Sequence, residues 1–311
     1  MKAFLRPSVL FTMAVLALLP LVLPNAFLLD LAIRICFAAI VAIGLNFLMG
    51  FAGQISIGHA AFVAMGAYAS AILTTNLNWP PLLALAAGAA GVGILAFLIA
   101  KPILRLQGHS LTMATLGLGI IVNIALVNEG WLTGGPDGAP VGPFSVGGFA
   151  FETPLQWYAL AAALLVVAIV LSLNLFASPA GRALRALHGS EVAARVMGVD
   201  TGAFKVRVFV LSAVVASIAG SLLAHYSAFI TPQLAGFMHS IEIATMVVVG
   251  GMASTFGAVI GACLLLILPQ LLGGLQDYEM VLFGLILMLT MIFLPGGLVP
   301  SLARRFGRKG H

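Results

Sequence analysis

Side chains able to do chemistry are few in this sequence and lie far apart. Two histidines, His59 and His225, fall within apolar segments. Neither has a second metal ligand three or four residues away, the spacing at which one helix face brings two ligands together. No lysine is followed by Ser or Thr, so the phosphate-binding P-loop is absent, and so are the HExxH, CxxC and GxSxG motifs. The sequence therefore predicts no catalytic residue, no metal site and no cofactor bound by this chain.

Three further ionisable residues fall inside apolar segments, where a charge is costly and often functional. Asp30 and Arg34 are four residues apart, so they can pair along one helix face, and we expect a structural ion pair. Glu242 stands early in a short apolar segment near the predicted outer face. Its carboxylate either stabilises a helix N-terminus or lines a gate, and the sequence leaves both roles open.

Two stretches interrupt the apolar segments with Gly and small polar residues, GFAGQISIGHAAF (50–62) and GGMASTFGAVIGA (250–262). Irregular backbone at membrane depth is tolerated only against protein or a water-filled path, and transporters use such breaks to line a substrate route. The alternative is a short loop followed by a Gly-rich packing helix. The predicted pathway residues are Gly50, Gly53, Gln54, Ser56, Gly58, His59, Glu242, Gly250 and Gly251.

The most charged stretch is RALRALHGSEVAARVMGVDTGAFKVR (182–207), with seven charged residues among 26 in a chain that is only 7% charged. We predict one helix that stops at Gly189. A second, short helix is capped by Ser190 and ended by Asp200 and Gly202.

This second helix carries a stripe of Val192, Val196 and Val199 and one possible ion pair, Glu191 with Arg195. It is too short to span a membrane. It either docks into a groove of a cytoplasmic partner or lies flat on the membrane surface. Its length and its apolar stripe are compatible with both.

The elements that must position these residues are membrane helices. The chain is 62% hydrophobic with a mean hydropathy of +1.17, well beyond a soluble domain. Apolar segments lie near 9–23, 27–49, 57–75, 80–100, 111–127, 155–176, 204–226, 239–250, 257–272 and 280–295. We predict one all-α polytopic membrane domain over 1–311, with about 8–10 transmembrane helices, some broken or short, and a short helix outside the membrane, which the resemblance given below implies is a cytoplasmic coupling helix.

Charge orients these helices, because basic residues collect in cytoplasmic loops. With ten crossings all basic residues except Arg34 lie on one side, which makes both termini cytoplasmic. The charged loop at about 178–205 is then cytoplasmic, and a Gly/Pro-rich external loop of turns is about 128–153. This external loop is either a linker or a surface for an external partner. The first apolar segment follows Lys2 and Arg6 without a cleavage site, so we read it as a retained span rather than a signal peptide.

Resemblance to known sequences adds to this reading. The stretch GSEVAARVMGVD resembles the coupling loop of ATP-binding cassette importer permeases, with Glu191, Ala193, Ala194 and Gly198 at the matching positions. The whole chain resembles M-type subunits of branched-chain amino acid permeases in GLNFLMGFAGQISIGHAAFVAMGAYAS (44–70), TLGLGIIV (115–122), GGPDG (134–138), SPAGRALRALHGSEVAARVMGVD (178–200) and GGMASTFGAVIGA (250–262). The resemblance implies coupling to ATPases through Gly189, Ser190, Glu191, Val192, Ala193, Ala194, Arg195, Val196 and Gly198.

The resemblance also implies a bacterial inner-membrane importer. Its other parts would be an H-type permease subunit, two cytoplasmic ATPases that bind ATP and Mg, and a periplasmic or extracellular amino-acid-binding protein. The cargo would be leucine, isoleucine, valine or a related amino acid. Importers of urea, short amides or organic acids share much of this pattern, and an ion-coupled secondary transporter is a further alternative. The basic tail is expected to be a juxtamembrane anchor in the lipid bilayer rather than a nucleic-acid patch.

Overall fold

The chain folds into a bundle of helices in a computed structural model, which describes residues 7–22 and 25–272, and then 281, 284, 285, 288, 289, 292, 293 and 296–301. The apolar helices are α1 (Pro7–Val22), α2 (Ala26–Asn46), α3 (His59–Thr75), α4 (Pro81–Ile103), α5 (His109–Asn128), α7 (Pro154–Ala177), α10 (Thr201–Ser227), α11 (Phe237–Gly250) and α12 (Thr255–Leu272). A π-helical turn, Phe47–Phe51, continues α2.

Five of these segments are long and apolar enough to cross a membrane: Ala26–Phe51, Pro81–Ile103, His109–Asn128, Pro154–Ala177 and Thr201–Ser227. The apolar parts of α1, α3, α11 and α12 are shorter. The predicted all-α polytopic fold is therefore confirmed. Most of the predicted segment 280–295 lies outside the described residues, as do Lys2, Arg6 and the basic tail.

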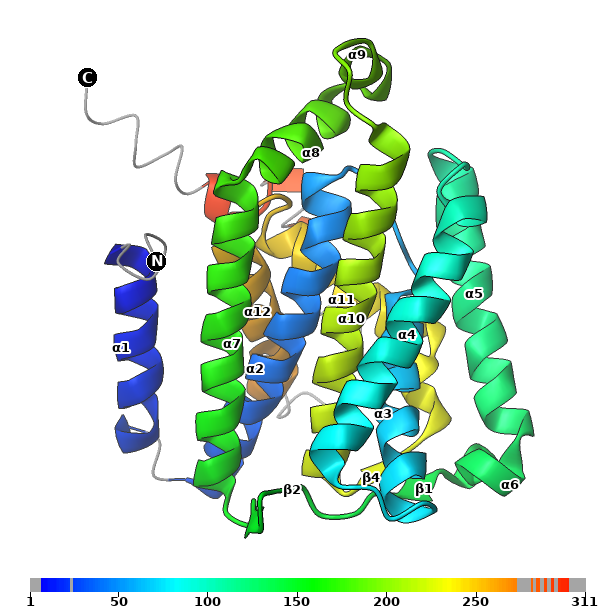
Figure 1. The fold of residues 1–311 in the computed structure, drawn as a ribbon. Helices are drawn as coiled ribbons and strands as arrows, with labels where there is room; N and C mark the ends of the chain where they lie inside the picture. Colours follow the sequence, from blue (N-terminus) through cyan, green and yellow to red (C-terminus); the bar gives the residue numbers. More distant parts are fainter. Residues whose placement is uncertain are drawn as a thin grey trace.

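Helix α10 is the centre of the bundle and packs against α2, α3 and α4 (Figure 1). Small residues let the backbones approach. A methyl group at Gly66 would overlap the carbonyl oxygen of Ser217, and one at Gly220 would overlap that of Val63. Membrane helices commonly associate through such close contacts. Moving an apolar side chain from lipid into a helix interface provides no hydrophobic driving force, so close packing must stabilise the interface.

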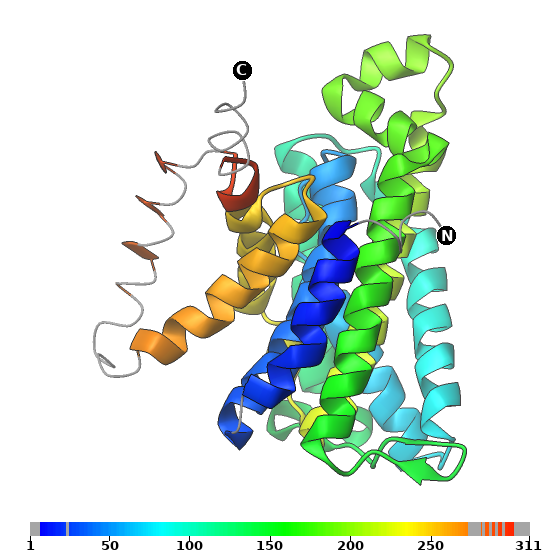
Figure 2. The same ribbon diagram turned by 90° about the vertical axis from the view of Figure 1, so that its left-hand side faces the viewer.

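Helix α2 joins this centre to α7 and α12, and α1 lies beside α7 on the flank (Figure 2). The predicted ion pair is present, with Arg34 Nε donating to Asp30 Oδ2 at 2.8 Å. The same carboxylate accepts a hydrogen bond from the Tyr226 hydroxyl on α10. Asp30 and Arg34 therefore fasten α2 to α10, which is the structural role expected of them.

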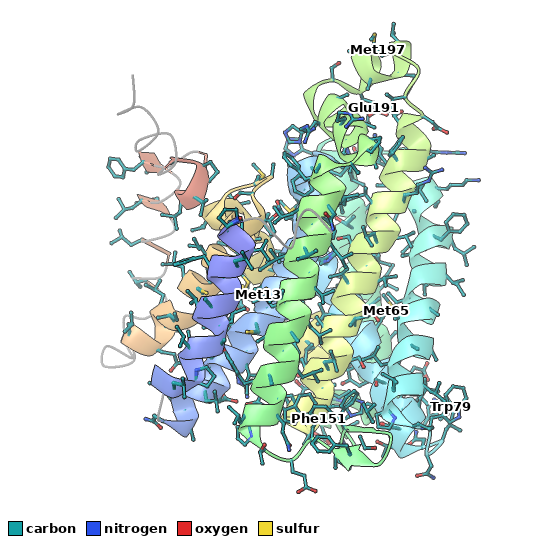
Figure 3. All side chains as sticks on the ribbon, turned by 60° about the vertical axis from the view of Figure 1, so that its left-hand side comes forward. Met13, Met65, Trp79, Phe151, Glu191 and Met197 are labelled. Atoms are coloured by element: carbon teal, nitrogen blue, oxygen red, sulfur yellow. The ribbon has the colours of Figure 1, made fainter. Side chains whose placement is uncertain are left out.

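The two ends of the bundle differ. Glu191 and Met197 lie at one end, and Trp79 and Phe151 lie at the other (Figure 3). The first end carries α8 (Pro179–Gly189) and α9 (Glu191–Val196).

The other end carries the loop predicted at 128–153, which the structure bounds by α5 and α7. This loop is more than a series of turns, which corrects the prediction. It contains α6 (Gly130–Thr133), η2 (Gly135–Asp137) and the strands β1 (Ala139–Pro140), β2 (Ser145–Val146) and β3 (Phe149–Ala150). Strand β1 pairs with β4 (Phe229–Ile230), and β2 pairs with β3. The pairing with β4 orders the loop against the end of α10, which local sequence could not reveal.

Candidate functional site

The candidate coupling site is the pair of short helices α8 and α9 at one end of the bundle. Ser178 caps α8, its hydroxyl accepting from the Gly181 amide at 3.2 Å. Ser190 caps α9 in the same way, with the Ala193 amide at 3.3 Å. The predicted break at Gly189 and the predicted cap at Ser190 are therefore confirmed. The cap at Ser178 was not predicted, although both Ser side chains satisfy free N–H groups in the same way.

The predicted end of the second helix is wrong. Helix α9 ends at Val196, and Gly198 then adopts φ +81°, a left-handed conformation that favours glycine. Asp200, expected to terminate this helix, instead caps the next one, its Oδ1 accepting from the Ala203 amide at 3.0 Å. Gly202 lies inside α10. An aspartate before an apolar run fits a helix start as well as a helix end, which explains the error.

Glu191 attaches α9 to the rest of the bundle. Its contacts with Lys205, Gln107 and Arg195 form the mount of α9. Its Oε2 accepts from Lys205 Nζ at 2.6 Å and from Gln107 Nε2 at 3.3 Å, and its Oε1 accepts from Arg195 at 3.1 Å. The pair with Arg195 was predicted. The pair with Lys205, whose side chain is only 2% exposed, was missed from the sequence. The carboxylate thus joins α9 to the central helix α10 and to the connection between α4 and α5.

The surroundings of Glu191 favour its charged form. Burial raises the pKa of the carboxyl, but the bonds from Lys205 and Arg195 and their positive charges outweigh burial and hold the pKa below 4.5, its ordinary value. A group whose pKa is lowered on folding stabilises the fold above its unfolded pKa and loses that effect as pH falls through the folded value. The mount of α9 is therefore fully formed at neutral pH.

The outer face of α9 is apolar and exposed. Val192 is 73% exposed, Val196 80% and the neighbouring Met197 83%. Ala194, on the opposite side, is buried. Val199, the third predicted member of the stripe, is partly buried because the chain turns at Gly198. Met197 takes its place, so the exposed face consists of Val192, Val196 and Met197.

Removing the carboxylate should loosen α9, which gives a first prediction. Glu191→Ala leaves the buried Lys205 ammonium without a partner, a loss of about 3 kcal/mol, or roughly 100-fold faster amide exchange across α9. Arg195→Ala removes only an exposed pair worth about 1 kcal/mol or less and should raise exchange less than about fivefold. Hydrogen exchange with mass spectrometry measures both. Equal exchange in the two variants would contradict a mount built on Glu191 and Lys205.

The first predicted break lies directly against this coupling segment. The chain leaves helical geometry after the π-helical turn and resumes it at His59. Gly53 adopts φ +66°, and a methyl group there would lie 3.0 Å from His188 Nδ1 at the end of α8. The break, the turn before α5 and the junction of α8 with α9 enclose a cavity of about 180 Å³, lined by Ala52, Gly53, Gln54, Ile55, Gln107, Gly108, Leu111, Leu187, His188 and Glu191.

Further along the break, the chain presses on α5. A methyl group at Gly58 would overlap the carbonyl oxygen of Thr115, whose hydroxyl accepts from the Ile57 amide at 3.2 Å. Ser56 is buried, and its hydroxyl has no hydrogen-bond partner among the described residues. The segment therefore contacts α5 at Ile57 and Gly58.

His59 opens α3 and is buried at 1% exposure. Its Nε2 lies 3.4 Å from the Ser212 hydroxyl, and its Nδ1 has no partner in the part of the chain that the structure describes. The next amide, that of Ala60, donates to the Ser240 hydroxyl of α11 at 3.3 Å. The described residues contain no group of three or more His, Cys, Asp or Glu side chains that could hold a metal.

Asn46 ties the two predicted breaks together, and it was missed from the sequence. Its Oδ1 accepts from the Ala253 amide at 3.0 Å, and its Nδ2 donates to the Ser254 carbonyl oxygen at 3.1 Å. Gly50 stands beside this contact, where a methyl group would overlap the Ala253 amide nitrogen. The available signal was an Asn within an apolar segment. The structure buries this side chain fully, and a buried amide must find hydrogen-bond partners.

In the second break, the glycines serve helix packing. A methyl group at Gly250 would overlap the carbonyl oxygen of Gly257, and one at Gly261 would overlap that of Met246. Gly251 adopts φ +123°, and a methyl group there would overlap Cδ of Pro300. The tight turn between α11 and α12 therefore needs these glycines for steric reasons.

Glu242 lies in the second turn of α11, and Gly236 is the residue that caps this helix. The capping alternative is therefore wrong. The carboxylate is half exposed and lies 3.2 Å from His239 Nδ1. Helix α11 begins within the bundle rather than at its end, since Asn123 of α5 donates to the Pro232 carbonyl oxygen at 2.8 Å in the preceding irregular segment. This third break, 228–236, was missed from the sequence.

Comparison with known proteins gives the family. The model for "Branched-chain amino acid transport system / permease component" matches residues 27–291. The high-affinity branched-chain amino acid transport system permease protein LivM of Salmonella typhimurium is 32% identical over 87% of this chain and 69% of that protein. LivH of Escherichia coli, described as a permease protein of the same type of system, is 28% identical over 84% of this chain and 90% of that protein.

The autoinducer 2 import system permease protein LsrC of Yersinia enterocolitica is 28% identical over 61% of this chain and 53% of that protein. No solved structure matches the chain. The family match and the apolar helices make this a multi-pass protein of a bacterial inner membrane and a transport subunit rather than an enzyme. The resemblance stated from sequence is confirmed, and the chain belongs to the family of permease components of branched-chain amino acid transport systems.

Proposed function

We propose that this chain forms part of the route by which branched-chain amino acids enter the cell, driven by ATP hydrolysis in separate subunits. The observation that carries the proposal is the short helix α9, which presents Val192, Val196 and Met197 to the surroundings. An apolar face this exposed on a helix of six residues is suited to a groove in a partner. ATP and Mg would be bound by that partner, since this chain has no P-loop.

Movement of α9 would reach the membrane by two contacts. Glu191 ties α9 to Lys205 of the central helix α10. His188, at the end of α8, lies against Gly53 in the first break. A displaced α9 would therefore pull on both, and the irregular segment 52–58 would shift against α5.

The proposed pathway lies beside α3, α5 and α11, where the irregular segments 52–58 and 228–236 both contact α5, at Thr115 and Asn123. Such backbone at membrane depth is a feature of substrate routes. The half-exposed Glu242 faces out of the subunit, so a second, H-type permease would complete the route. The outward face of α5 is apolar and exposed at Met113, Ile120, Ile121 and Ile124. It would pack on that subunit or on lipid.

Cargo would be delivered by an external binding protein to the end that carries the 128–153 loop. That end would be outside, with both termini cytoplasmic, which gives a labelling prediction. In a background lacking Cys36 and Cys263, Phe149→Cys should react with an impermeant thiol reagent on intact cells, and Gly189→Cys should not. Gly189 has open space around it, and Phe149 is exposed, so neither change strains the fold. Labelling at Gly189→Cys but not at Phe149→Cys would reverse the orientation.

Uptake of labelled leucine tests the function in cells that lack their own leucine uptake and express this chain with its partners. Depleting ATP while the proton gradient is kept should stop uptake, and a protonophore with ATP kept should leave it nearly unchanged. The opposite pattern would identify an ion-coupled transporter. Isoleucine and valine should compete with leucine. Competition by urea, short amides or organic acids instead would assign the alternative cargo.

A further inference from the structure

A basic pocket lies at the end of the bundle that carries α8 and α9, between the end of α4 and the start of α10. It has a volume of about 540 Å³ and is lined by Phe97, Lys101, Leu104, Arg105, Asp200, Gly202, Ala203, Val206 and Arg207. This volume falls within the range of roughly 300–1,000 Å³ that is typical of ligand sites. Neither the mount of α9 nor the proposed pathway uses it.

The charge of this pocket is unbalanced. Three basic side chains face one acid, Asp200, whose Oδ1 is already engaged by the Ala203 amide at 3.0 Å. Among the described residues, no carboxylate lies within 4.0 Å of Lys101, Arg105 or Arg207. The three cations are exposed, so their positive charge is available to an anionic ligand.

The pocket continues into an apolar surface on α4. Ile94, Phe97 and Leu98 are 63%, 54% and 68% exposed. Phe97 and Leu98 lie three and four residues after Ile94, and Lys101 follows them at the same spacing. Arg105 lies two residues beyond the end of α4, so this helix face changes from apolar to basic at the end of the span. A ligand that matches this face is apolar along most of its length and anionic at one end. An acidic protein surface would match only the basic part.

We propose that the pocket binds the phosphate headgroup of an anionic phospholipid of the inner leaflet, with an acyl chain lying along α4. The headgroup would bridge Lys101 and Arg105 at the end of α4 to Arg207 in α10. Because α10 also carries Lys205, the bound lipid would brace the helix on which α9 is mounted. Each basic side chain near an anionic lipid contributes roughly a fivefold gain in affinity, so three should contribute roughly 100-fold.

Native mass spectrometry of the assembled, full-length permease tests this. The wild type should bind dioleoyl phosphatidylglycerol in preference to dioleoyl phosphatidylcholine. The combined change Lys101→Gln, Arg105→Gln and Arg207→Gln should reduce phosphatidylglycerol affinity roughly 100-fold. The control Arg182→Gln, Arg185→Gln and Arg195→Gln removes the same charge at the same end outside the pocket. It should reduce that affinity less than about threefold.

Two further measurements distinguish a lipid from other ligands. Inorganic phosphate at the concentration of the lipid should not displace phosphatidylglycerol, and displacement would show a site for small anions rather than lipid. The pocket variant should retain its ATPase subunits on purification. Loss of those subunits with unchanged phosphatidylglycerol affinity would show a protein-docking surface and overturn the proposal, as would equal loss of lipid in the pocket and control variants.

Discussion

Gly58→Ala should reduce uptake at least tenfold, although it adds only one methyl group. That methyl group would overlap the carbonyl oxygen of Thr115, so the obstacle is backbone and cannot turn aside as a side chain can. Overpacking costs about 1–3 kcal/mol even where side chains can adjust. Here α5 or the segment 52–58 must move, and that segment also contacts α8 through Gly53. Uptake of labelled leucine per molecule of permease in the membrane is the measurement.

Gly117→Ala is the matched control. Gly117 lies on α5 two residues after Thr115, and a methyl group there would have nothing within 4 Å. Its uptake should stay within about twofold of wild type. If Gly58→Ala accumulates normally and transports at the wild-type rate, the contact between the first break and α5 is not needed for transport.

The double change Val192→Asp and Val196→Asp should release the ATPase subunits and abolish uptake. Burying one valine in a partner is worth roughly 1.5–3 kcal/mol, so losing two weakens docking by at least a hundredfold. The aspartates would also bring two charges into an apolar groove, which adds to the loss. Both side chains are exposed in this chain, so its own fold should survive. Co-purification of the ATPase subunits from detergent is the measurement.

Arg195→Ala is the control, because it changes the same helix without touching its apolar face. An exposed pair such as Arg195 with Glu191 contributes about 1 kcal/mol or less, so this variant should keep most of its ATPase and most of its uptake. Retention of ATPase at wild-type levels by the double aspartate variant, with normal uptake, would mean that α9 is a surface helix with no role in docking.

Local features of the fold could be predicted because they depend on nearby residues. Hydropathy located the apolar helices, and the hydroxyl side chain of Ser190 marked the start of α9. The pair of Asp30 and Arg34 followed from their spacing along one helix. The sequence failed where one local pattern has two readings, as at Asp200, which resembles the end of α9 but caps α10.

Contacts between distant segments could not be predicted. Lys205 is fourteen residues from Glu191, and Asn46 is more than two hundred residues from Ser254, so no helical spacing relates them. The break at 228–236 also escaped, because a Gly/Pro-containing stretch is the same in sequence whether it lies outside the membrane or folds back into the bundle. Its contact with Asn123 is what distinguishes the two.

The most direct test of the account is photo-crosslinking from Met197, which is 83% exposed at the tip of α9. A photoreactive amino acid there should crosslink to the ATP-binding subunit in membranes of cells that transport leucine. The same amino acid at Phe149, at the opposite end of the bundle, should not. Crosslinks from Met197 to lipid alone, in cells whose uptake is normal, would contradict the claim that this helix couples the permease to its ATPases.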